Sequence, residues 1–173
     1  SSTLNAPHNH ISQNASLRVN DQELKNRKSL GLTPAWRLNI KNCLKYINSQ
    51  KEKIYWEDIK QGKNLLNLDQ FGDVIIARKD ILTSYHLSVT VDDNSDGVTH
   101  IIRGNDLESY TNIHRLLQVL LNLRETKWFH HKLVKDTNGK RIAKRSNSKL
   151  TIKELRKNGY SAKEVIKLAK SST

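Results

Sequence analysis

Runs in which apolar and polar residues alternate recur through the middle of the chain, and each predicts a β-strand. Trp36, Leu38 and Ile40 alternate with polar residues, as in a half-buried strand. Similar apolar runs predict strands at 54–58, 72–78, 85–91 and 98–102. The last two are expected to join through a tight turn at 94–97, where Asn and Gly tolerate positive φ.

A helical period replaces this alternation after residue 110. The apolar positions of one stripe follow the spacing i, i+3, i+4, i+7 and i+8, and they are Ile113, Leu116, Leu117, Leu120 and Leu121. Such a stripe predicts a helix that packs into the core, and either Ser109 or Thr111 is expected to cap its start.

Two short helices are predicted near the C-terminus. Thr151 with Glu154, and Ser161 with Glu164, each form a capping box, in which hydroxyl and carboxylate satisfy the N–H groups of a helix start. A hairpin-type turn at 136–139 precedes them. Together, these elements predict an α/β fold with mixed strands followed by short helices.

The first 32 residues lack any comparable periodicity. They are rich in Ser, Asn, Gln and charged residues, with some helical tendency around 21–28. This composition predicts a polar segment at 1–32, loop-like or poorly ordered, followed by one folded domain at 33–173.

The chain is strongly basic, and its positive charge is concentrated at one end. Its 30 Lys and Arg residues against 17 Asp and Glu residues give a formal net charge of +13. Between 124 and 173 there are 15 basic and 4 acidic residues. Two interpretations stay open: a solvated, solubilising tail, or a surface that faces the phosphates of a nucleic acid.

The cysteine content and the apolar runs bear on compartment and metal binding. Cys43 is the single cysteine, so no disulfide forms within the chain, which fits a reducing compartment. No apolar run approaches the ~20 residues of a membrane span, and 1–16 lacks the apolar core of a signal peptide. A cytoplasmic protein without membrane attachment is expected. His8 and His10, in a polar segment far from Cys43, make a poor zinc site, so no metal site is predicted.

The residues from Tyr85 to Gly104 hold the side chains best suited to binding a substrate. Arg103 ends an apolar run, where a guanidinium can clamp a carboxylate with two hydrogen bonds. An ion pair with Asp92 or Asp93 explains the same arginine equally well. Tyr85 opens a predicted strand, which is typical of half-buried packing. Adjacent residues of a strand point to opposite faces, so Asp92 and Asp93 are not expected to share one ligand.

The run YHLSVTVDDNSDGVTHIIRG resembles the signature of glutamyl-type class I aminoacyl-tRNA synthetases, and within them that of the glutamyl-Q tRNA(Asp) synthetases. In that family an aromatic residue and an apolar run precede two aspartates, and a Gly-Val-Thr-His stretch leads to Arg-Gly. The resemblance extends over about 34–169 and includes the Trp-Arg-Leu segment at 36–38. It implies the C-terminal half of a Rossmann-like catalytic domain, in which Tyr85 and Arg103 contact the substrate glutamate.

A basic loop at 139–145, read as GKRIAKR, resembles the Gly-x-x-x-x-Lys loop whose best-known form is KMSKS. The lysines of that loop hold the phosphates of ATP in the transition state. The resemblance implies Lys144 as the catalytic residue, and Lys144, Arg141 and His130 as contacts of ATP. Taken alone, the basic run is as typical of a solvated turn, and for His130 packing is an equally open interpretation.

Motifs that the family requires elsewhere are not found in this sequence. It contains no His-x-Gly-His or His-x-Gly-Ser motif of the HIGH type, and it lacks the zinc ligands of the glutamyl-Q enzymes, so zinc is not expected in this chain. The sequence is therefore expected to be the C-terminal half of an enzyme whose N-terminal half is missing or supplied by another chain. Activity of this chain alone is uncertain on the same ground.

The resemblance implies an activity and its partners. The enzyme activates glutamate with ATP, which binds with Mg²⁺ as a substrate, and transfers it to the queuosine base of tRNA(Asp). Only 29 residues follow Lys144, which leaves no room for an anticodon-binding domain and favours the glutamyl-Q enzymes. The alternatives are a truncated ordinary glutamyl-tRNA synthetase, a non-catalytic RNA-binding remnant and an unrelated basic α/β domain.

Overall fold

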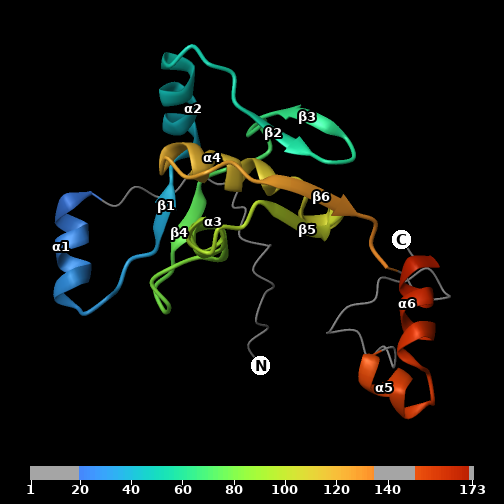
Figure 1. Cartoon of the computed structure of the whole chain (residues 1–173). Helices are drawn as coiled ribbons and strands as arrows, with labels where there is room; N and C mark the ends of the chain where they lie inside the picture. The colour runs from blue at the N-terminus through green and yellow to red at the C-terminus, as the bar shows by residue number, and fades with distance from the viewer. Residues whose placement is uncertain (1–19, 135–150, 172–173) are drawn as a thin grey trace.

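The computed structural model describes residues 20–134 and 151–171, and Figure 1 shows the arrangement of their helices and strands. The elements before residue 80 are α1 (Asp21–Ser29), β1 (Trp36–Leu38), α2 (Ile40–Ser49), β2 (Tyr55–Asp58), β3 (Gly62–Leu65) and β4 (Val74–Ala77). Those after it are α3 (Tyr85–Ser95), β5 (His100–Gly104), the 3-10 helix η1 (Asn105–Leu107), α4 (Thr111–Leu120), β6 (Lys127–His131), α5 (Ile152–Lys157) and α6 (Ala162–Ser171).

The strands form one mixed sheet and one separate pair. The mixed sheet has four strands in the order β3-β2-β6-β5, in which β6 runs parallel to both β2 and β5 while β3 is antiparallel to β2. Strands β1 and β4 form a separate antiparallel pair. Parallel neighbours need long crossover connections, and here helices lie between them in the chain. The predicted α/β class with mixed strands is confirmed.

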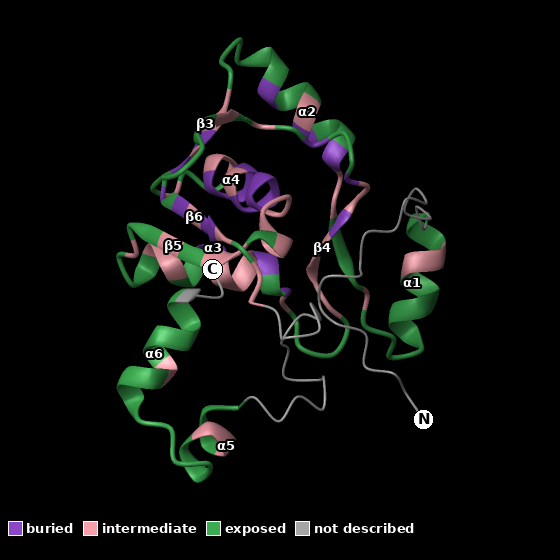
Figure 2. Ribbon diagram, turned by 90° about the vertical axis from the view of Figure 1, so that its right-hand side faces the viewer, coloured by how far each residue is buried: buried purple, intermediate pink, exposed green. Residues whose placement is uncertain are grey.

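Helix α4 carries the centre of the hydrophobic core. Ile113 and Leu116 are fully buried, and Leu117 is nearly so. They pack against residues from α2, from the segment before β4 and from the start of β4, namely Ile40, Cys43, Ile47, Leu68, Phe71 and Val74. Buried residues lie on one side of α4 and at intervals along α2 (Figure 2). The predicted apolar stripe is therefore core packing from Ile113 to Leu120, whereas Leu121 follows the end of α4 and is 46% exposed.

Helix α2 corrects the first predicted strand. Trp36 and Leu38 do belong to β1, but Ile40 begins α2 and its side chain is buried in the core. Asn39 causes the change, because its side-chain oxygen accepts a hydrogen bond from Asn42 N at 2.8 Å and so caps the new helix. The strands predicted at 54–58, 72–78 and 98–102 correspond to β2, β4 and β5 and are confirmed.

The strand predicted at 85–91 is wrong, since this segment forms helix α3. Ser84 is its N-cap and accepts a hydrogen bond from Leu87 N at 3.3 Å. Within the helix, Thr90 Oγ1 donates to His86 O at 2.8 Å, and these two residues, one turn apart, form its buried face. The turn expected at 94–97 becomes the end of this helix, where Gly97 has a φ of 71°.

The two predicted C-terminal helices are confirmed as α5 and α6. Thr151 Oγ1 accepts from Glu154 N at 3.1 Å, and Ser161 Oγ accepts from Glu164 N at 3.3 Å. The Ser161 box is reciprocal, because Ser161 N donates to Glu164 Oε2 at 2.8 Å. Helix α1 matches the helical tendency noted at 21–28, while the division at residue 32 stays a prediction. The turn predicted at 136–139 lies outside the described residues.

The reciprocal cap makes Ser161 the residue that sets the start of α6. We expect Ser161→Ala to destabilise this helix by about 1 kcal/mol, because two hydrogen bonds at its first turn are lost. Amide hydrogen exchange at Glu164 and Val165 measures this, since the first donates to the Ser161 hydroxyl and the second to its carbonyl. Unchanged exchange at both amides would contradict the capping role.

None of the helices in the described part of the chain combines the length and the apolar character that a membrane span requires.

Candidate functional site

Three side chains meet at the carboxyl ends of the parallel strands. Asp58 is the last residue of β2, and Arg103 on β5 is paired in register with His130 on β6. Helix α4 adds Thr111 and His114, and α3 adds His86. We call these six residues, joined by hydrogen bonds, the Arg103 cluster. In parallel sheets, ligands bind beyond the carboxyl ends of the strands, so the cluster lies where a substrate site is expected.

Arg103 is the centre of the cluster. Its Nε–H donates to His130 Nε2 at 3.2 Å, and Nη1 donates to His114 Nδ1 at 2.9 Å. Nη2 donates to Thr111 Oγ1. Because three nitrogens are each held by a different neighbour, the guanidinium plane has one defined orientation. The hydroxyl expected to cap α4 is thus used here, and the N-cap of that helix is Tyr110, without a side-chain hydrogen bond.

The acceptors around Arg103 are uncharged groups. The charges of Asp93 and Asp106 act on the guanidinium from nearby. Within the described part of the chain, however, neither Asp92 nor Asp93 forms a salt bridge with it. The ion pair with Asp92 or Asp93 that the sequence left open is therefore not formed. Burial lowers the pKa of Arg103, and the nearby Tyr85, Asp93 and Asp106 oppose this shift. The arginine stays protonated, since its ordinary pKa is far above neutrality. A half-buried cation of this kind attracts an anionic ligand.

Asp58 and His130 form a fully buried pair behind Arg103. Asp58 Oδ2 accepts from His130 Nδ1 at 2.7 Å and from His130 N at 3.2 Å. Its other oxygen accepts from the backbone N–H groups of Lys60 at 2.8 Å and Gln61 at 3.0 Å. Both side chains have a relative exposure of 0%. Asp58 therefore anchors the imidazole to a turn of the backbone.

The hydrogen bonds also place the protons on the imidazoles. His130 Nε2 accepts from Arg103, so the ring proton lies on Nδ1 and points to Asp58. His114 Nδ1 likewise accepts from Arg103, so its proton lies on Nε2 and is donated to His86 Nδ1 at 3.0 Å. Both rings are neutral in this arrangement, and the positive charge resides on the guanidinium.

The pKa values of the cluster agree with this placement. Burial lowers the pKa of His114 well below its usual value, and the positive charge of Arg103 adds to the effect. Burial also lowers the pKa of His130, although Asp58 opposes the shift. For Asp58, burial raises the pKa, but the hydrogen bonds from His130 and from the backbone of Lys60 and Gln61 outweigh it, so its pKa lies below the usual range.

These shifts predict a loss of stability in weak acid. His114 and His130 bind fewer protons in the folded than in the unfolded chain, so the free energy of unfolding falls as pH falls through about 6.5. The fall continues until the lowered folded-state pKa values are reached. Urea denaturation at pH 7.5, 6.5 and 5.5 should give midpoints that decrease in that order. A midpoint that is constant over this range would contradict the neutral rings.

Tyr85 lies beside the cluster at the first turn of α3. Its ring contacts those of His86 and His114, with centroid distances of 5.5 and 6.0 Å. Its side chain also lies in hydrogen-bonding range of the Arg103 guanidinium. With 38% of its surface exposed, Tyr85 lies at the edge of the cluster rather than inside it. The structure thus brings together the two residues that the sequence assigned to glutamate, although Tyr85 opens a helix and not a strand.

Asp92 and Asp93 also need correction, because they lie on helix α3. Consecutive helical residues are about 100° apart, so the argument from opposite strand faces does not apply. Asp92 is exposed and Asp93 half-buried. Burial raises the pKa of Asp93. The charge of Arg103 opposes this shift, whereas the charges of Asp92 and Asp96 add to it. Asp93 thus lies near enough to influence the guanidinium without bonding to it.

Gly104 allows the chain to turn closely past the site. A Cβ atom at this position would lie 2.5 Å from Asp106 Oδ1 and 2.9 Å from Leu133 Cδ2. Both distances are shorter than real Cβ contacts, so the segment after Arg103 accommodates only a glycine without movement. A larger residue at position 104 would therefore require the side chains of Asp106 and Leu133 to move.

Four members of the cluster were not expected from the sequence: Asp58, His86, Thr111 and His114. Asp58 had one usable signal, since it follows Trp56 by two residues and so shares the inward face of a strand. A carboxylate on such a face requires hydrogen-bonding partners. His86 and His114 have no comparable local pattern, because their contact joins two helices.

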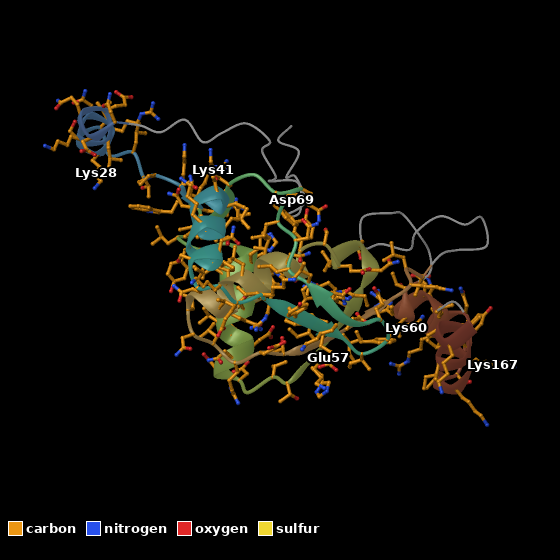
Figure 3. All side chains as sticks on the ribbon, turned by 90° about the horizontal axis from the view of Figure 1, so that it is seen from above. Lys28, Lys41, Glu57, Lys60, Asp69 and Lys167 are labelled. Carbon is orange, nitrogen blue, oxygen red and sulfur yellow. The ribbon has the colours of Figure 1, made fainter. Side chains whose placement is uncertain are left out.

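The residues assigned to ATP have different outcomes. Lys144 and Arg141 lie outside the described residues. His130 is described, and its two ring nitrogens lie within hydrogen-bonding distance of Asp58, Arg103 and Thr111. Its contact with ATP stays a prediction. Further basic side chains are exposed on α5 and α6, including Lys167 (Figure 3).

The fold and this site define a class I aminoacyl-tRNA synthetase catalytic domain. Residues 2–170 match the family model described as "tRNA synthetases class I (E and Q), catalytic domain", and the chain belongs to this family. The resemblance seen in residues 85–104 is thereby confirmed.

Individual proteins of known sequence or structure are also similar to this chain. The chain is 46% identical over 97 residues to a glutamyl-Q tRNA(Asp) synthetase of Rhodobacter capsulatus, a match that covers 56% of the chain and 34% of the relative. It is 31% identical over 151 residues to glutamate–tRNA ligase 2 of Bartonella tribocorum, covering 87% of the chain and 33% of the relative. The crystal structure of a glutamate tRNA ligase from Elizabethkingia meningosepticum aligns with a TM-score of 0.56 at 21% identity, over 84% of the chain and 26% of that structure.

The chain spans about a third of the length of the curated relatives it matches. The solved structure shows the fold alone, and it agrees with the C-terminal part of a Rossmann-like catalytic domain.

Proposed function

We propose that the chain forms part of a site that activates glutamate with ATP and transfers it to the queuosine base of tRNA(Asp). The observation that carries the proposal is the Arg103 guanidinium, half-buried at the carboxyl end of β5 and hydrogen-bonded to uncharged acceptors. A carboxylate ligand can accept two parallel hydrogen bonds from such a guanidinium. Tyr85, at the edge of the cluster, is the second glutamate contact.

Activation joins the glutamate carboxylate to the α-phosphorus of ATP and releases pyrophosphate. The protein has two tasks: the first is to orient the two reactants, and the second is to neutralise charge on the phosphates. We assign the second task to Lys144 and Arg141 on the basis of their place in the KMSKS-like loop, with ATP entering as its Mg²⁺ complex. The structure of the described residues bears only on the first task.

The choice of the glutamyl-Q reaction over ordinary glutamyl-tRNA synthesis rests on the relative from Rhodobacter capsulatus. The basic charge after residue 124 supports an RNA partner, because Lys and Arg side chains neutralise backbone phosphates.

The first test is glutamate-dependent exchange of pyrophosphate into ATP by the purified chain without tRNA. We expect exchange, and a strong loss of it in Lys144→Ala. Lys149→Ala is the matched control, since it removes the same charge five residues further along the same basic segment. Absence of exchange in the unaltered chain, or an equal loss in both variants, would contradict catalysis by this chain.

The second test concerns the acceptor. Labelled glutamate should be transferred to tRNA(Asp) that contains queuosine and not to the same tRNA without it. Transfer to the 3′ end of tRNA(Glu) instead would indicate an ordinary glutamyl-tRNA synthetase. Salt-sensitive RNA binding without exchange or transfer would indicate a non-catalytic RNA-binding module.

A further inference from the structure

We propose that Asp58 and His130 form a positioning pair that fixes the Arg103 guanidinium in its ligand-binding orientation. This inference rests on the proposed function, because the ligand of Arg103 is taken to be glutamate. Neither residue of the pair is exposed, so both act through Arg103 and not on the ligand directly.

The register of the sheet makes the pair possible. Arg103 and His130 are partners on the adjacent parallel strands β5 and β6. Their side chains leave the sheet on the same face, and His130 Nε2 meets Arg103 Nε at 3.2 Å. This contact holds Nε, the guanidinium nitrogen nearest to the strand. The two terminal nitrogens then point toward α4 and the ligand side.

Asp58 determines which nitrogen of His130 can accept. Its carboxylate accepts from the proton-bearing Nδ1 at 2.7 Å, and this leaves Nε2 as the acceptor that faces Arg103 Nε and the Thr111 hydroxyl, at 3.2 and 3.1 Å. The carboxylate cannot turn away, because its second oxygen is held by Lys60 N and Gln61 N. The backbone turn thus fixes the carboxylate, the carboxylate fixes the imidazole, and the imidazole fixes the guanidinium. These contacts run from β2 through β6 to β5. Carboxylates that hold imidazoles at metal sites act in the same way.

The positioning role has a physical benefit for binding. A free arginine side chain populates many rotamers, and ordering it on binding costs up to about 2 kcal/mol. A guanidinium that is already oriented avoids most of this loss. The neutral, Nδ1-protonated ring also leaves the guanidinium as the positive group nearest the ligand, whereas a doubly protonated ring would repel it.

Nuclear magnetic resonance of the whole 173-residue chain tests the pair without any ligand. Nitrogen shifts should show His130 as the Nδ1–H tautomer, and Arg103 Nε–H should give a slowly exchanging signal. In Asp58→Asn the tautomer preference and the Arg103 signal should both be lost. Glu57→Gln is the matched control. Glu57 (labelled in Figure 3) lies next to Asp58 on β2. Its carboxylate forms an exposed ion pair with Lys127, at 3.1 Å.

Two substitutions of His130 separate positioning from a merely structural role. The amide nitrogen of an Asn reaches the place of Nδ1 and keeps the bond to Asp58, while the amide oxygen of a Gln reaches the place of Nε2 and keeps the acceptor for Arg103. We expect His130→Asn to weaken L-glutamate binding about tenfold. In His130→Gln, unlike in His130→Asn, the Arg103 Nε–H signal should be present, and the affinity for L-glutamate should lie within about threefold of that of the unaltered chain.

The outcomes distinguish this inference from the proposed function. If L-glutamate fails to bind the unaltered chain, the proposed function is contradicted, while the Arg103 Nε–H signal in the variants still decides the positioning role. If His130→Asn and Asp58→Asn, both shown to be folded, retain the Arg103 signal and the glutamate affinity, the positioning pair is refuted. A protonated Nε2 on His130 in the unaltered chain would refute it as well.

Discussion

Replacing Asp58 by Asn should lower the free energy of unfolding by about 3 kcal/mol. An asparagine offers one oxygen where the carboxylate offers two, so its amide N–H₂ must face either the N–H groups of Lys60 and Gln61 or those of His130. In the first orientation two part-buried donors lose their acceptor, and in the second two buried ones do. The loss of an acceptor by a buried donor costs about 1–3 kcal/mol. Urea denaturation at pH 7.5, monitored by tryptophan fluorescence, measures the change.

The pH dependence gives this prediction a second part. Since the pKa of Asp58 is depressed in the folded chain, its contribution is present above the unfolded pKa and is lost as pH falls through the folded value. The difference between the two proteins should therefore stay constant near neutrality and shrink only below about pH 4. Glu57→Gln, at an exposed ion pair, should change the stability by less than about 1 kcal/mol. Equal destabilisation by both substitutions would contradict the role given to Asp58.

Replacing Arg103 by Lys should weaken the binding of L-glutamate about 30- to 100-fold. An ammonium keeps the charge, but it cannot give two parallel hydrogen bonds to a carboxylate and hold His130, His114 and Thr111 at the same time. The loss corresponds to hydrogen bonds with charged groups, worth about 2–3 kcal/mol in total. Isothermal titration of the chain with L-glutamate measures it.

Arg124→Lys is the matched control for this substitution. Arg124 is exposed and donates from Nη2 to Asn94 O at 2.9 Å, outside the Arg103 cluster. The same chemical change there should leave the affinity for L-glutamate within about twofold. If both variants bind as the unaltered chain does, Arg103 is not the carboxylate contact and the proposed function loses its main support. Binding of L-glutamine with equal affinity would show that the side-chain carboxylate is not recognised.

Local patterns were sufficient for much of this fold. The apolar stripe of α4, the strand at Tyr55–Asp58 and the two C-terminal capping boxes were all visible, because each is set by neighbours within a few residues. Arg103 and Tyr85 could be selected for the same reason, together with the family resemblance. These are the cases in which propensity, pattern and tertiary packing agree.

Helix α3 shows where a local pattern misleads. Leu87, Val89 and Val91 alternate with polar residues and are β-branched or aliphatic, which is typical of a strand. The structure selects the helix because Ser84 caps it and because His86 and Thr90, at helical spacing, face the interior. Their buried contacts are made with residues far away in the sequence, such as His114, and no window around position 88 contains that information.

Strand β6 was missed for a related reason. Its buried positions are Trp128 and His130, and a histidine does not register as an inward-facing residue in an apolar pattern. The ring is buried because Asp58 and Arg103 satisfy both of its nitrogens. Sequence reasoning therefore found the arginine of the cluster but not the residues that orient it, since their roles exist only across neighbouring strands.

The span of the Arg103 cluster has a consequence for the life of the protein in a cell. Asp58 and His130 are 72 positions apart, His86 and His114 are 28 apart, and Arg103 joins the two pairs. A peptide that lacks either β2 or β6 therefore lacks a member of the Arg103 cluster. A small acid that binds Arg103 would bind only molecules that have finished folding. Such binding would stabilise only chains in which β2, α3, β5, α4 and β6 have all reached their folded arrangement.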